Sequence, residues 1–84
     1  MEIRFTKHAL EKFTLLRRHG VLVSQSKVLR TVASPDNIDY RRDPLLIAQS
    51  NLDLMHVLRV VYRVEGTVRI IITFYPGRKS QYEN

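Results

Sequence analysis

The sequence contains no cysteine, which excludes a disulfide framework, a zinc site with thiolate ligands and a thiol nucleophile. Glycine is also scarce, with three residues in the chain, and no GxSxG, P-loop or GxGxxG motif is present. The three histidines follow no HExxH or Cys/His spacing. These absences disfavour nucleotide-driven and metal-dependent chemistry, and the sequence predicts neither a metal nor a cofactor.

Long apolar runs are missing as well. No run approaches the roughly 20 residues that cross a bilayer, and Met1–Arg4 does not lead into the hydrophobic stretch of a signal peptide. We therefore expect a cytoplasmic protein that does not enter the membrane. With 84 residues, the chain is predicted to form a single domain spanning 1–84.

Positive charge dominates the composition. Fourteen Lys and Arg residues face eight Asp and Glu residues, so the net charge is +6. A basic protein favours an anionic partner, and we rank nucleic acid first, an acidic protein second and a membrane surface third. The composition is otherwise close to that of an ordinary globular domain, with 44% hydrophobic and 26% charged residues.

Apolar periodicity predicts a short strand and two helices in the first half of the chain. Ile3 and Phe5 alternate with charged residues, as in a half-buried strand. Residues 7–19 carry apolar side chains at helical spacing, between a Thr6 N-cap and a Gly20 stop. A second, shorter helix is predicted to follow a Ser24 N-cap and to end at the Ser34-Pro35 pair.

The second half reads as β structure. Residues 38–40 and 45–48 are predicted to form edge strands, and 54–64 and 67–75 a terminal hairpin. The fold class is therefore predicted as α+β, with two N-terminal helices packed on one face of a small antiparallel sheet.

The register of the hairpin decides which side chains share a face. A three-residue loop over 64–66, with Gly66 in a G1 bulge, pairs Val60 with Ile70 and Leu58 with Ile72 and keeps both apolar sets on the core side. In that register the opposite, open face carries four notable side chains, Arg59, Arg63, Arg69 and Tyr75.

Clustered arginines on an open sheet are well suited to phosphate, because each guanidinium is a planar fork of hydrogen-bond donors. Arg78, Lys79 and Tyr82 on the C-terminal tail extend the predicted patch. The alternative is that alternating arginines only keep the sheet soluble and protect its edge.

His8 and Lys12 lie four residues apart and share one face of the first helix. This spacing suits a general base next to a phosphate-binding cation, and it is also common among ordinary surface residues.

Both ends of the chain resemble the RelE-like toxin superfamily. The opening FTKHALEKF and RRHGVLVSQ segments and the closing LRVVYRVEGTVRIIITFYPGRKSQYE segment are most similar to BrnT-like toxins and to short domains that begin with a Thr-Lys-His-Ala helix. The resemblance implies a metal-independent ribonuclease in which a ribose 2′-hydroxyl attacks the adjacent phosphate. It implies catalytic roles for His8, Arg59, Arg69, Arg78 and Tyr82. The helix face and the basic patch described above predict RNA contacts from four further residues, Lys12, Arg63, Tyr75 and Lys79.

The departures from the family pattern concern Lys12, which replaces the usual arginine, and a sheet face without the paired lysines of ribosome-dependent enzymes. Three functions therefore stay open. The first is a toxin-type endoribonuclease neutralised by an antitoxin protein. The second is a non-catalytic module that binds nucleic acid or an acidic protein. The third is a structural subunit that pairs through an edge strand, including as a homo-oligomer.

Overall fold

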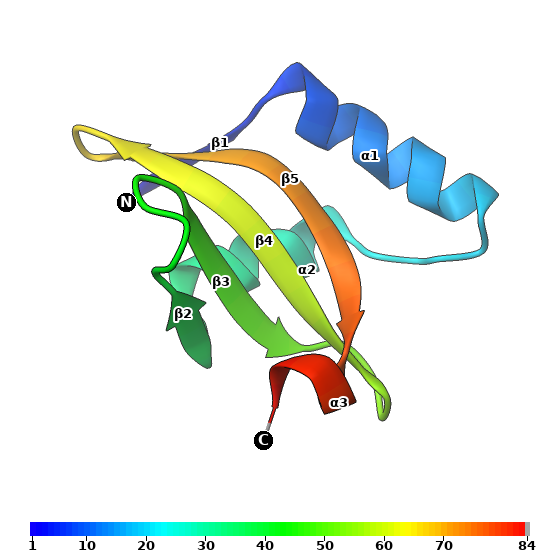
Figure 1. Ribbon diagram of the computed structural model, residues 1–84. Coiled ribbons are helices and arrows are strands. Elements are labelled where there is room, and N and C mark those ends of the chain that lie inside the picture. The colour runs from blue at the N-terminus through cyan, green and yellow to red at the C-terminus, as the bar shows by residue number, and fades with distance from the viewer. Residues whose placement is uncertain (84) are drawn as a thin grey trace.

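A computed structural model describes residues 1–83 of the protein as two layers (Figure 1). One layer is a five-stranded sheet in the order β1-β5-β4-β3-β2, in which β1 runs parallel to β5 and all other neighbours are antiparallel. The elements along the chain are β1 (Glu2–Phe5), α1 (Lys7–Arg18), α2 (Gln25–Ala33), β2 (Asn37–Asp39), β3 (Leu46–Asn51), β4 (His56–Glu65), β5 (Val68–Arg78) and α3 (Lys79–Tyr82). The predicted α+β class, with two N-terminal helices on the sheet, is confirmed.

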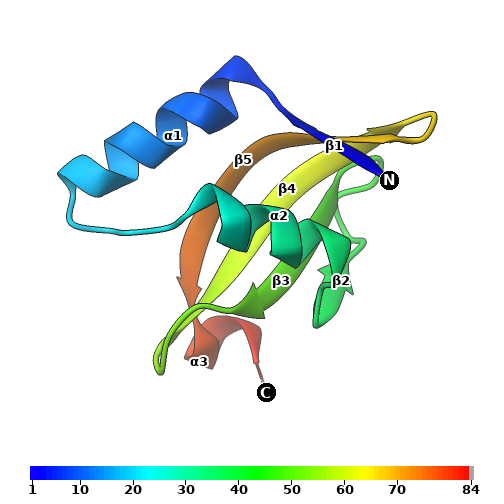
Figure 2. The same ribbon diagram turned by 180° about the vertical axis from the view of Figure 1, so that it is seen from behind.

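The second layer consists of α1 and α2, which cover one face of the sheet (Figure 2). Both helices begin as predicted, because the Thr6 side chain accepts from the Ala9 amide and the Ser24 side chain accepts from the Lys27 amide. Gly20 follows α1 with a φ of 77°, a left-handed conformation that ends the helix. No helix within residues 1–83 is long and apolar enough to cross a membrane.

The core lies between the helices and this face of the sheet. Side chains from α1 and α2 meet those of the two central strands, and the fully buried members include Val28, Val32, Leu58 and Phe74. Phe13 of α1 packs on Phe74, with ring centroids 4.4 Å apart. The predicted apolar stripes of both helices therefore face the core, except for Leu10 and Ala33, which are exposed.

The β4–β5 hairpin turns at a different place from the predicted one. Glu65 pairs with Val68, so the loop is the two residues Gly66 and Thr67, and the predicted three-residue loop over 64–66 is wrong. Gly66 has a φ of 61° at the first loop position, as a type II′ turn requires.

A bulge in the middle of β5 lets the two-residue loop coexist with apolar side chains on the core face of both strands. Val61 pairs with Thr73 and Tyr62 pairs with Ile71, which leaves Ile72 as an extra residue. The Thr6 hydroxyl donates to the Ile72 carbonyl at 3.2 Å. The predicted pairs are therefore replaced by Val60 with Phe74 and Leu58 with Pro76.

The bulge also reverses the faces of the first part of β5. Arg69 and Ile71 lie on the side of the sheet covered by the helices, whereas Arg59 and Tyr75 lie opposite each other on the uncovered side. A single extra residue therefore separates arginines that were predicted to share a face. β2 is an edge strand as predicted, but β3 lies inside the sheet between β2 and β4.

Candidate functional site

Arg59 occupies the centre of the sheet face that α1 and α2 do not cover, and only 4% of its surface is exposed. Its guanidinium donates to the Tyr75 hydroxyl at 3.1 Å, to Oδ2 of Asp39 at 2.9 Å and to Oε1 of Gln49. The three acceptors stand on β5, β2 and β3, so one side chain of β4 connects four strands. Because the guanidinium is buried and already bonded to three protein acceptors, it is not accessible to a phosphate.

Asp39 is shared between Arg59 and the exposed Arg41. Arg41 donates to the Asp39 carboxylate from its side chain at 2.8 and 3.0 Å and from its backbone amide at 2.9 Å. These bonds from Arg41, helped by the one from Arg59, hold the pKa of Asp39 well below its usual range although burial opposes them. The lowered pKa and the bonds from two arginines make this carboxylate a weak proton acceptor, so it is poorly suited to act as a general base.

The C-terminal helix α3 packs against β4 and β5 at one end of the sheet (Figure 1). The Tyr82 ring centroid lies 4.1 Å from Cζ of Arg59, within the range of a cation–π contact. Gly77 makes room for the ring, since a Cβ at this position would lie 2.5 Å from Cε2 of Tyr82. Arg59 and Tyr82, two of the residues assigned to catalysis, thus meet in a packed contact.

Arg69 lies on the other side of the sheet. Its Nη1 donates to the backbone carbonyl of Val32 at 2.9 Å, and its Cζ lies 5.8 Å from the Tyr62 ring centroid. Val32 belongs to the last turn of α2, whose carbonyls have no partner within the helix. Arg69 therefore caps α2.

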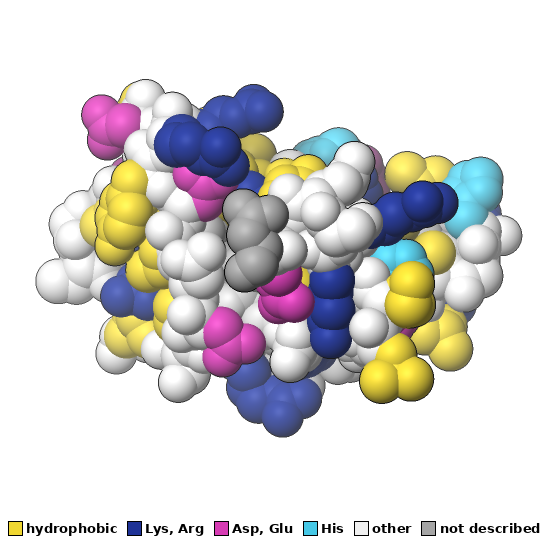
Figure 3. Space-filling view, turned by 60° about the horizontal axis from the view of Figure 1, so that its bottom comes forward, with side chains coloured by type: hydrophobic (Ala, Val, Ile, Leu, Met, Phe, Trp, Pro, Cys, Tyr) yellow, Lys and Arg dark blue, Asp and Glu magenta, His cyan; other side chains and the backbone are white. Residues whose placement is uncertain are grey.

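The predicted open cluster of arginines is not formed. Arg59 is buried, Arg69 faces the helices, and Arg63 is bound to its neighbour Glu65 at 3.3 Å. On the face that contains α3, acidic and basic side chains are interspersed (Figure 3). The prediction of three free guanidinium groups on one open face is wrong, because the bulge at Ile72 and the acceptors around Arg59 were not apparent in the sequence.

The remaining predicted site residues fall into two groups. Arg78 and Lys79 stand where β5 passes into α3, with Arg78 exposed and Lys79 half-buried, close to Tyr75 and Tyr82 in the chain. His8 and Lys12 belong to α1, in the layer on the far side of the sheet. The sheet separates His8 from Tyr82, so these two are not brought together.

Most of the positive charge without a carboxylate partner in residues 1–83 belongs to the helices, although Arg42, Arg69, Arg78 and Lys79 outside them also lack one. Six cations lie on α1 and α2 against one acidic residue, Glu11, and none of the six lies within ion-pair distance of a carboxylate in residues 1–83. They are Lys7, Lys12, Arg17, Arg18, Lys27 and Arg30. Sequence reasoning placed the basic surface on the hairpin, although counting charges for each predicted helix would have revealed this one.

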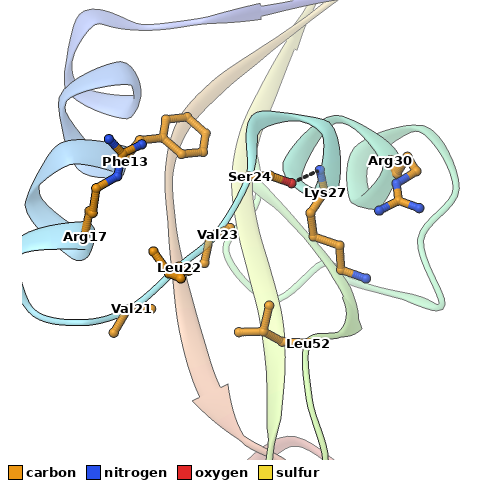
Figure 4. A pocket seen from close by; sticks show the side chains of 9 residues that line it. All are labelled: Phe13, Arg17, Val21, Leu22, Val23, Ser24, Lys27, Arg30 and Leu52. Carbon is orange, nitrogen blue, oxygen red and sulfur yellow. Dashed lines mark hydrogen bonds between the residues drawn. The ribbon is translucent and has the colours of Figure 1, made fainter.

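Three of these cations line a pocket of about 550 Å³ between α1 and α2 (Figure 4). Arg17 comes from α1, and Lys27 and Arg30 come from α2. The rest of the lining is the 21–24 connection, Phe13 and Leu52, and it contains no carboxylate. The arrangement combines apolar side chains with an unopposed positive rim.

No group of three or more His, Asp or Glu side chains within residues 1–83 is arranged to hold a metal ion. His56 is bound to Asp53, with Nδ1 2.9 Å from Oδ1, at the turn between β3 and β4. The amide of Met55 and the side chain of His56 lower the pKa of Asp53. This pair fixes a turn.

The chain matches no family model, no curated protein and no solved structure. The resemblance to RelE-like toxins therefore rests on the sequence segments alone.

Proposed function

We propose that this protein is a non-catalytic binding module that recognises an anionic macromolecule through α1 and α2. The observation that carries the proposal is the charge of the helix layer, six cations to one carboxylate with no ion pair among them. Like charges at this density repel one another until an anion or solvent screens them, and a polyanion gains affinity by releasing its counterions.

The charges outside α1 and α2 also support the helices as the binding surface. Outside α1 and α2, residues 1–83 carry eight Lys and Arg against seven Asp and Glu, and three of these carboxylates, Glu2, Asp39 and Glu65, bond to arginines. This near balance of charge leaves the helices, with six cations to one carboxylate, as the more positive surface.

Cleavage of RNA is less well supported than binding. A ribonuclease that attacks through the 2′-hydroxyl needs a general base and phosphate-binding cations around one scissile bond. Arg59 and Tyr82 are in contact, but the predicted base His8 lies across the sheet and Arg69 is bound to the Val32 carbonyl on that other side. The five residues proposed for catalysis therefore do not share one site.

A toxin-type, metal-independent endoribonuclease held by an antitoxin is the second candidate. One observation favours it: Arg78 is exposed and Lys79 is partly exposed, three and four residues before Tyr82, at the end of the chain where the RelE-like resemblance is most specific. In this case RNA would be cleaved at the tail, and Arg78→Ala or Tyr82→Phe would abolish product formation.

The experiment that separates the two candidates uses one labelled single-stranded RNA of 20 nucleotides in EDTA. We expect binding whose logarithm falls linearly with the logarithm of salt concentration, and no product on a denaturing gel. Product that disappears in Tyr82→Phe would establish the nuclease instead. Absence of both binding and product at about 50 mM salt, with labelled polyglutamate also unbound, would refute a polyanion-binding role.

A further inference from the structure

The groove between α1 and α2 is the first pocket described above, and it is lined by apolar side chains as well as by cations. Its inner wall is apolar, with Phe13, Val23 and Leu52 among its lining residues, and Leu22 at the same site is 80% exposed. Figure 4 shows Leu22, Val23 and Leu52 between Arg17 on one side and Lys27 on the other. The site therefore presents apolar surface and cations to the same ligand.

The apolar surface continues beyond the first pocket. A second pocket of about 410 Å³ shares Val21, Leu22 and Leu52 with it and extends to Pro76 and to the Asp53–His56 pair. At the β3–β4 turn, Leu54 is 90% exposed and Met55 is 69% exposed. Hydrophobic side chains also gather beside histidine and basic side chains at one end of the molecule in Figure 3. A ligand that follows this path is extended rather than compact.

We propose that the groove binds an acidic peptide segment of a partner protein, anchored by leucine-like side chains and flanked by Asp or Glu. The inference rests on the proposed function and names the class of anion. Arg17, Lys27 and Arg30 supply the charge complementarity, since no carboxylate lines their pocket. Extended peptides and amphipathic helices are recognised in this way, by apolar anchors in a groove with charged flanks.

Nucleic acid fits the same groove less well. Proteins that hold single strands stack bases on exposed aromatic rings. The one aromatic ring that lines this pocket, Phe13, is already packed between Phe74 and Phe5, with centroids 4.4 and 5.7 Å away. Leucine and valine side chains neither stack with bases nor donate hydrogen bonds to them, so the apolar wall would add nothing to the binding of RNA.

A second copy of this chain is also a poor occupant. Each copy carries a net charge of +6, and the rim of the groove is itself cationic. Two such surfaces repel at low ionic strength, when an acidic peptide binds most tightly.

The test compares three fluorescein-labelled probes by anisotropy against the full chain. The first is a 14-residue peptide of Asp and Glu with leucines at two positions four residues apart, the second has both leucines replaced by serine, and the third is the 20-nucleotide RNA. We expect the leucine peptide to bind roughly tenfold or more tightly than the serine peptide, the effect of burying aliphatic side chains. Phosphatidylserine vesicles provide a fourth arm.

Two single variants locate the site. Leu22→Ser, at an 80% exposed position that the fold does not depend on, should weaken the leucine peptide several-fold and leave the serine peptide and RNA unchanged. Arg17→Gln should weaken both peptides. Val64→Ser, at a 51% exposed position on β4 outside the groove, is the control and should change nothing.

Equal affinity for the leucine and serine peptides would overturn the groove proposal while leaving polyanion binding intact. Vesicle binding that depends on Leu22, with no discrimination between the peptides, would overturn it in favour of a membrane surface. If none of the probes binds, both this inference and the proposed function fail.

Discussion

Replacing Arg59 by alanine tests whether this side chain is part of the framework of the sheet. The substitution removes three hydrogen bonds and leaves Tyr75, Gln49 and Asp39 without their shared donor at a site where Arg59 itself is 4% exposed. Removing one partner of a buried ion pair typically costs about 3–5 kcal/mol. Because Arg41 still neutralises Asp39, we expect a value near the lower end, about 3 kcal/mol.

A loss of this size is large for a small domain. Typical stabilities of about 0.05–0.15 kcal/mol per residue correspond to roughly 4–13 kcal/mol for 84 residues, so the variant would lose between a quarter and three quarters of the total. At about 4–8 °C per kcal/mol, its Tm should fall by at least roughly 12 °C. Urea and thermal unfolding followed by circular dichroism would measure both quantities.

Arg63→Ala is the matched control on the same strand and the same face. Arg63 is 42% exposed in its side chain and bonds only to the exposed Glu65, so its loss should cost no more than about 0.5 kcal/mol. If Arg59→Ala and Arg63→Ala were equally mild, the Arg59 guanidinium would have to lie in solvent, and the assignment of a structural role would be refuted.

Three further predictions concern local features of the fold. Gly77→Ala should displace the Tyr82 ring and lower the free energy of unfolding in urea by about 1–2 kcal/mol. In a double-mutant cycle, the same substitution should cost much less when Tyr82 is already alanine. Hydrogen bonds from Arg41 lower the pKa of Asp39, so the ionised carboxylate stabilises the fold fully above its unfolded pKa of 3.8 and loses this effect as pH falls through the folded pKa. The free energy of unfolding should therefore decline below about pH 4. Asp39→Asn should flatten that decline in a pH series of unfolding curves. Ser24→Ala removes the N-cap of α2 and should cost about 1 kcal/mol in the same assay, and no change would contradict the capping role.

The helices and their ends were predictable from sequence because the signals are local. Thr6 and Ser24 stand directly before apolar residues at helical spacing, and Gly20 and Pro35 stand directly after. Each of these positions acts on backbone groups within four residues, so no knowledge of the tertiary structure is needed.

The hairpin register was not predictable in the same way. The stretch Ile70–Ile72 offers three apolar residues in a row, and each could serve as the extra residue of a bulge without changing the pattern. The choice of Ile72 depends on packing against the helices and on the hydroxyl of Thr6, 66 positions earlier in the chain.

The role of Arg59 depended on distant residues as well. Its partners Asp39, Gln49 and Tyr75 lie 10 to 20 positions away, and β2 reaches it only through β3. An arginine on the solvent parity of a strand gives no sign in the sequence of being buried beneath the Tyr82 ring. The position of the unpaired charge follows from this, because burying Arg59 and turning Arg69 toward α2 leave the helices as the basic surface.

The claim that α1 and α2 form the anion-binding surface is tested most directly by two triple variants with the same net charge. One carries Arg17→Gln, Lys27→Gln and Arg30→Gln in the helix layer, and the other carries Arg42→Gln, Arg63→Gln and Arg78→Gln outside it; each lowers the net charge from +6 to +3.

Affinity for the 20-nucleotide RNA is measured from about 50 to 200 mM salt for both. If the helices form the binding surface, the first variant loses most of its affinity and its salt slope falls by about 2, while the second keeps a slope close to that of the unmodified protein. Equal losses in the two variants, or a larger loss in the second, would contradict the account.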